Sequence, residues 1–106
     1  MFSIQNEPIE SNIFLRELGD LSAGARVVFE GTVRNHNEGR TVASLEYEIF
    51  AELALKEGNE IIERAKQKFD LIQIRACHRQ GKINLGETAV WIGVSSAHRE
   101  DAFKAC

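Results

Sequence analysis

The sequence is poor in proline, cysteine and tryptophan, and it contains no long apolar run. Its 106 residues include one proline, two cysteines and one tryptophan. No apolar stretch approaches the roughly 20 residues that a membrane-spanning helix needs, and the N-terminal MFSIQNEPIE lacks the basic and apolar regions of a signal peptide. Cys77 and Cys106 match no metal-binding or redox spacing, so we expect a reduced, cytoplasmic setting.

Basic residues are not concentrated in any part of the chain. Thirteen Lys and Arg residues against 16 Asp and Glu residues give a net charge of −3. A general nucleic-acid binder needs a basic face that neutralises phosphates, so this class is excluded. A small anionic ligand needs only a few cationic groups in one pocket and is compatible with the composition. With no repeat, linker or low-complexity segment, residues 1–106 are predicted to form one domain.

The histidines and cysteines predict neither a metal site nor a cysteine nucleophile. His36, His78 and His98 are scattered along the chain. Cys77 and His78 are adjacent on a predicted strand, where neighbouring side chains point to opposite faces and cannot chelate one ion. Cys77 lies among β-forming residues and is expected to be buried and inert. His78 and Arg79 end that strand, where a histidine bonded to the backbone is the ordinary arrangement.

Hydrophobic periodicity predicts an α+β fold with a mixed, mostly antiparallel sheet and two to three helices. Strands are expected over residues 2–9, 25–35, 42–50, 71–79 and 87–97, and helices over residues 11–19, 51–69 and from 97 onward. The segment QGKINLGE is interpreted as a turn with Gly81 and Gly86 at its ends. Only one connection is long enough for a helical crossover, which favours antiparallel pairing.

Particular side chains are expected to cap the helices or to share a face. Ser11 or Asn12 is expected to cap the first helix, and Ser96 is a candidate cap for the last. The sets expected to share a face are Val27, Phe29, Gly31 and Val33; Leu45, Tyr47 and Ile49; and, on the long helix, Ala54, Leu55, Gly58, Ile61, Ile62, Ala65 and Phe69.

The segment VSSAHREDAF joins a predicted strand to a predicted helix. His98 and Arg99 would fall in the first turn of that helix, whose unpaired N–H groups carry partial positive charge. Arg99 adds a planar set of donors suited to phosphate or carboxylate, and His98 can donate, accept or carry a proton. Glu100 and Asp101 would partly offset the positive charge. The pattern predicts either an anion cradle or an ordinary solvated surface.

A second candidate for anion binding is the segment EGTVRNHNEGR. Arg34 and Arg40 flank the polar loop NHNEG, in which Gly39 is free to take a turn conformation. This composition is typical of a mobile anion-binding loop, and it is equally typical of a polar hairpin tip.

Four blocks of the sequence together resemble the large, catalytic subunit of molybdopterin synthase. They are FEGTVRNHNEGR, LEYE, HRQGKINLGE and VSSAHREDAFKAC, and their order and spacing match that family along essentially the whole chain. The resemblance implies an α/β hammerhead fold and a central homodimer. It also implies a heterotetramer, in which each protomer takes up a small sulfur-carrier subunit of ubiquitin-like fold with a Gly-Gly tail ending in a thiocarboxylate.

The resemblance further implies a reaction and a set of substrate-binding residues. Two sulfurs pass from the carrier to cyclic pyranopterin monophosphate and form the dithiolene of molybdopterin, in molybdenum cofactor biosynthesis. No metal or organic cofactor is required, because the carrier delivers the sulfur. By position, the substrate-binding residues fall on Thr32, Val33, Arg34, His98 and Arg99. We expect Arg34, Arg99 and the helix N-terminus to converge on the substrate's phosphate. We expect His98 to orient that phosphate or to move protons, and the loop after Arg34 to close over the ligand.

The family's catalytic residues are lysines that match no position of this sequence. They lie beyond the position of Cys106, one on the continued last helix and one in a Trp-Lys motif. Lys104 would face away from His98 and Arg99 on the helix, and Lys82 lies in the predicted turn. We therefore expect a truncated family member with little sulfur-transfer activity alone. A natural fragment completed by another chain and a degenerate copy are the alternatives.

Two other functions are compatible with the sequence. The first is a non-catalytic module that binds the carrier protein or the pterin phosphate without converting it. The second is an unrelated anion-binding α+β domain, which would have no affinity for a Gly-Gly-tailed carrier.

Overall fold

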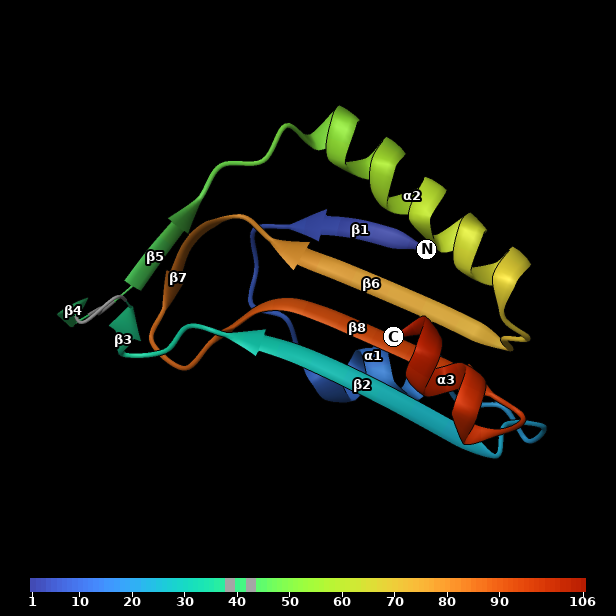
Figure 1. The fold of residues 1–106 in the computed structure, drawn as a ribbon. Coiled ribbons are helices and arrows are strands. Elements are labelled where there is room, and N and C mark those ends of the chain that lie inside the picture. The colour runs from blue at the N-terminus through green and yellow to red at the C-terminus, as the bar shows by residue number, and fades with distance from the viewer. Residues whose placement is uncertain (38–39, 42–43) are drawn as a thin grey trace.

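The centre of the protein is a four-stranded mixed sheet in the order β1-β6-β8-β2 (Figure 1). The computed structural model describes residues 1–37, 40–41 and 44–106. Among these residues, only the backbone is described for residues 37, 40–41 and 44–47. β1 runs parallel to β6, and the other neighbours are antiparallel, which confirms the predicted α+β class. The elements are β1 Phe2–Gln5, α1 Ser11–Glu17, β2 Ala25–Thr32, β3 His36–Asn37, β4 Arg40–Thr41, β5 Ser44–Tyr47, α2 Ala51–Lys68, β6 Gln73–Arg79, β7 Gly81–Asn84, β8 Thr88–Ser96 and α3 Arg99–Ala105.

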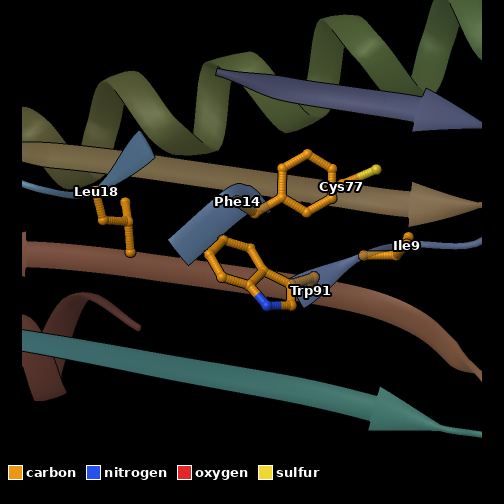
Figure 2. Close-up of a cluster of buried hydrophobic side chains, with 5 residues drawn as sticks. All are labelled: Ile9, Phe14, Leu18, Cys77 and Trp91. Atoms are coloured by element: carbon orange, nitrogen blue, oxygen red, sulfur yellow. The ribbon is translucent and has the colours of Figure 1, made fainter. Parts of the chain in front are cut away.

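The main core lies between α1 and one face of the sheet. Leu18, Cys77 and Trp91 are fully buried there, and Ile9 and Phe14 are nearly so. Figure 2 shows these five side chains gathered around strands β6 and β8. The rings of Phe14 and Trp91 lie 5.4 Å apart between centroids. Burial of each large apolar side chain contributes about 1.5–3 kcal/mol, so this cluster is what holds α1 on the sheet.

Trp91 also determines how α1 begins. Its indole N–H donates a hydrogen bond of 2.9 Å to the hydroxyl of Ser11. The N-cap of α1 is Glu10, and no side chain caps the helix, so the prediction that Ser11 or Asn12 is the cap was wrong. The Ser11 hydroxyl accepts a hydrogen bond from the buried indole of Trp91 instead of capping the helix. Gly93 leaves room for the same ring, because a Cβ there would lie 2.3 Å from the indole.

The opposite face of the sheet is covered by α2 and by the end of α3 (Figure 1). Within the predicted apolar stripe of α2, Leu55 and Ile61 are 36% and 58% exposed, and the other members are at least partly buried: Ala54, Gly58, Ile62, Ala65 and Phe69. The close fit is at Gly58, where a Cβ would lie 2.5 Å from the ring of Phe2. The buried face of α2 is narrower than predicted, because the helix packs mainly on the edge strand β1.

Beyond one end of the main sheet, β5 pairs with β7 and β3 pairs with β4 as two short antiparallel ribbons (Figure 1). Within the segment QGKINLGE, which was predicted to be a turn, Gly81–Asn84 form strand β7 and a turn remains only at Asn84–Glu87. Gly81 is the first residue of β7 and pairs with Tyr47, whereas Gly86 lies in the turn after the strand. Both glycines have positive φ, of 87° and 81°. The turn predicted at Gly39 and the inward faces predicted for Leu45 and Tyr47 lie outside the described residues and side chains.

Candidate functional site

The end of β2 carries the first group of candidate residues. Thr32 is exposed, and Val33 is 3% exposed and packs with Ile83 and Ala89 in a second small core. Arg34 follows directly and is exposed. Its side chain makes no hydrogen bond or ion pair with any residue whose side chain the structure describes. Among the described side chains, none occupies the donors of Arg34, while the side chain of Val33 belongs to the core.

The backbone of Val33 is held on both sides by the turn Asn84–Glu87. The Val33 N–H donates to the Glu87 carbonyl at 3.0 Å, and the Gly86 N–H donates to the Val33 carbonyl at 2.8 Å. Within the turn, the Asn84 N–H donates to the Glu87 carboxylate at 2.8 Å. These bonds set the direction in which the chain leaves Val33 and enters Arg34.

A buried arginine supports the same turn. Arg79 is 7% exposed, and its Nη1 lies 3.1 Å from Oε2 of Glu87. The guanidinium also donates to the backbone carbonyls of Asn6 and Lys82, at 3.1 and 3.3 Å. The hydrogen bond from the Asn84 backbone, followed by the contacts with Arg79, holds the pKa of Glu87 below its usual 4.5. Arg79 thus anchors this turn to the end of β6.

At the end of β6, the sequence predicted the backbone bond of His78 correctly but did not predict the ion pair of Arg79. The Nδ1–H of His78 donates to the Arg79 carbonyl at 2.7 Å, which is the predicted backbone bond. The part played by Glu87 was missed. The available signal was the position of Arg79 and Glu87 on either side of the short segment between Gly81 and Gly86, where opposite charges can meet when the segment folds back on itself.

The second group of candidate residues lies where β8 passes into α3. His98 is the N-cap of α3 and Arg99 is its first residue, and both are exposed. Their place at the start of the helix is as predicted. Ser96 is not the cap, because it is buried at the end of β8 and its hydroxyl donates to the carbonyl of His98. Among the side chains that the structure describes, none forms a hydrogen bond or ion pair with Arg99.

Arg34 and Arg99 lie at opposite ends of β2. The strand pairs antiparallel with β8, so that Ala25 lies opposite Ser96, just before α3, while the Arg34 end lies opposite the start of β8 (Figure 1). Eight extended residues span about 23 Å. The predicted convergence of the two arginines on one anion is therefore not met within one copy of the chain. The physical reason is the antiparallel register, which separates the end of one strand from the end of its partner.

The two lysines considered as substitutes for the family's lysines do not face a common site. Nζ of Lys104 lies 2.9 Å from Oε1 of Glu100 on the surface of α3. This hydrogen bond and the carboxylate's charge raise the pKa of Lys104 above 10.5, so its amine stays protonated at neutral pH. Lys82 is exposed on β7, a different element.

The cysteines are buried to different degrees. Cys77 is fully buried in the main core, as predicted. Cys106 lines an apolar cavity of about 200 Å³ between α2, the sheet and the end of α3. Burial raises the pKa of the Cys106 thiol above 9.0, which lowers its thiolate fraction at neutral pH.

Metal-binding and membrane-spanning features were sought in the described part of the chain. Within residues 1–37, 40–41 and 44–106, no three side chains of His, Cys, Asp or Glu are grouped so that they could hold a metal ion. In the same ranges, every helix is too short or too polar to cross a bilayer.

The fold and the exposed cations define an α+β domain that presents arginines at both ends of its edge strand. Over residues 4–106 the chain matches the family model described as MoaE protein. It is 48% identical over 84 residues to the molybdopterin synthase catalytic subunit of Thermoplasma volcanium, covering 79% of this chain and 61% of that protein. It is 38% identical over 104 residues to the subunit of the same name from Haemophilus influenzae, covering 97% and 69%. The chain belongs to the MoaE family.

Solved structures agree with this assignment. The molybdopterin synthase structure from Staphylococcus aureus superposes with a TM-score of 0.89 at 34% identity, covering 96% of this chain and 74% of that one. A structure from Helicobacter pylori, a complex of subunits 1 and 2 of molybdopterin-converting factor, has a TM-score of 0.82 at 18% identity, covering 98% of this chain and 70% of that one. The second likeness supports the fold alone. The relatives are longer than this chain, which spans 61% to 69% of the two named proteins.

Proposed function

We propose that this chain supplies the pterin-binding part of a molybdopterin synthase. The substrate is cyclic pyranopterin monophosphate, and the sulfur donor is the thiocarboxylated Gly-Gly tail of a small ubiquitin-like carrier subunit. The observation that carries the proposal is that Arg34 and the His98–Arg99 pair, which match the family's substrate-binding blocks, are exposed at strand and helix ends. Arginine donors of this kind suit a cyclic phosphate.

A site that uses both arginines requires two copies of the chain. Within one copy they lie about 23 Å of strand apart. We propose a homodimer in which Arg34 of one copy and His98 and Arg99 of the other share a phosphate. β2 is an edge strand, and its Val28 and Phe29 side chains are 38% and 51% exposed. An antiparallel approach of two such edges would bring the Arg34 end of one strand to the α3 end of the other.

Within this site, each candidate residue would have a distinct role. Arg34 and Arg99 would neutralise and orient the phosphate, and His98 would orient it or move a proton. Thr32 would contribute its exposed hydroxyl, and Val33 would act through the core that fixes the strand end. With one carrier on each protomer, the assembly would be a heterotetramer. The two cysteines are free, which suits a reducing cytoplasm.

We also propose that the 106-residue chain, taken as a single domain, transfers little sulfur by itself. No residue of it matches the family's lysines, and Lys104 is paired with Glu100. The alternative function is a module that binds the carrier or the pterin phosphate without converting it. Reading the coding sequence downstream of codon 106 separates the two, because an in-frame segment with both lysines supports the enzyme.

Calorimetric titration with the pterin phosphate tests the proposed site. Arg34→Ala and Arg99→Ala should each weaken binding by about 1.5–3 kcal/mol, which is the range of a charged hydrogen bond. Arg64→Ala removes an exposed arginine from α2 and serves as the matched control. Unchanged affinity in both site variants would overturn the proposal. A pull-down with a Gly-Gly-tailed ubiquitin-like carrier tests the partner, and failure to capture it would argue against the carrier as a partner of this chain.

A further inference from the structure

The backbone of the turn Asn84–Glu87 bonds to the strand end that precedes Arg34, and the side chain of Glu87 connects the turn to Arg79. Its backbone holds both polar groups of Val33, the residue before Arg34, at 3.0 and 2.8 Å. The carboxylate of Glu87 closes the turn through the Asn84 N–H at 2.8 Å and meets the buried guanidinium of Arg79 at 3.1 Å. The side chain of Glu87 therefore links the end of β6 to the strand end that presents Arg34.

From this linkage we infer that Glu87 is a positioning residue for Arg34. The inference rests on the proposed function, and it assigns a role that Glu87 performs without touching the substrate. Among the described residues, the backbone bonds of Val33 are the contacts nearest to Arg34 that hold the chain in place as it enters Arg34. That backbone is held by the turn, and the turn is held by Glu87.

The two bonds of the carboxylate have separable roles. The bond from the Asn84 N–H needs only an acceptor oxygen, which glutamine also provides. The contact with Arg79 needs the negative charge, because it pairs a guanidinium that is 7% exposed. Glu87→Gln therefore keeps the turn and loses the anchor, whereas Glu87→Ala loses both. A graded effect, with Gln between Glu and Ala, is the signature of this arrangement.

The experiment measures the Kd for the pterin phosphate by calorimetry in the full chain, for Glu87→Ala, Glu87→Gln, Arg34→Ala and the double variant of Arg34 and Glu87. Glu17→Ala is the matched control, since Glu17 forms a comparable ion pair of 3.0 Å with Arg75 on another part of the sheet. Circular dichroism and thermal unfolding verify the fold of each variant. If the alanine variant at 87 does not fold, the glutamine variant takes its place.

We expect Kd to rise about tenfold in Glu87→Ala and about threefold in Glu87→Gln, with Glu17→Ala unchanged. When Arg34 is already alanine, replacing Glu87 should change Kd by less than about twofold, because its effect passes through Arg34. An equal loss in both backgrounds would identify a general structural role and overturn the inference. Wild-type affinity in folded Glu87→Ala would overturn it as well.

A second readout separates this inference from the proposed function. The ¹⁵N relaxation of the Arg34 backbone amide should show greater mobility in Glu87→Ala than in Glu17→Ala. If Arg34→Ala binds the pterin phosphate normally, the proposed function fails. The relaxation of the Arg34 amide then still shows whether Glu87 orders this strand end. Equal mobility of that amide in Glu87→Ala and Glu17→Ala would refute such a role.

Discussion

Mixed dimers of two arginine variants test the proposed geometry in depth. Arg34 and Arg99 lie at opposite ends of one strand, so a shared site must take one from each of two chains. The perturbation is an equal mixture of Arg34→Ala and Arg99→Ala chains, exchanged to equilibrium. About half of the dimers are then mixed. In each mixed dimer one site lacks both arginines and the other retains both, so about a quarter of all sites are intact.

The expected titration follows from these proportions. Each pure variant should bind the pterin phosphate about tenfold to 150-fold more weakly than wild type, the equivalent of about 1.5–3 kcal/mol. The mixture should show wild-type affinity at about a quarter of the wild-type stoichiometry. Mixing Arg34→Ala with the double variant of Arg34 and Arg99 is the control, since it restores no site. An absence of high-affinity sites after verified exchange would refute the two-chain arrangement.

Three further predictions concern stability, measured by urea denaturation. Ile83→Ala should cost about 2–5 kcal/mol, because Ile83 is fully buried in the small core beneath the site; a cost below about 1 kcal/mol would contradict that. Trp91→Phe should lower the free energy of unfolding by about 1–3 kcal/mol. Its effect should not add to that of Ser11→Ala, because the two side chains share one hydrogen bond. Fully additive losses in the double variant would contradict that bond. The folded pKa of Glu87 is depressed below 4.5, so its stabilisation is present above that pH and is lost as the pH falls through the folded pKa. The stability gap between wild type and Glu87→Gln should therefore be full at pH 7 and shrink in acid, and a gap independent of pH would argue against the charge.

Much of the fold could be predicted from local patterns. The 3.6-residue period of α2 and the β-forming runs of β2, β6 and β8 appear within short windows of sequence. The misses share one cause, which is a partner distant in sequence. Strand β7 was interpreted as a turn because its pairing with β5 cannot be recognised from Gly81–Asn84 alone. Ser11 was expected to cap α1, but Trp91, 80 residues away, takes its hydroxyl.

In the candidate site, too, the residues within motifs could be predicted from the sequence, and the residue that depends on distant contacts could not. Motif blocks indicated Arg34, His98 and Arg99, and the structure exposes all three. Glu87 was not indicated, since its importance depends on contacts with Arg79 and with the backbone of Val33. Those contacts exist only after the turn Asn84–Glu87 has packed against the ends of β2 and β6, and no local propensity reports them.

By itself, the sequence determined the α+β class, the membership in a family and the residues that carry charge toward a ligand, because composition, periodicity and motif spacing are properties of the chain. Only the tertiary structure decided where those charges lie. The antiparallel register of β2 and β8 places the arginines at opposite ends of a strand, and register is set by side-chain packing between segments far apart in sequence.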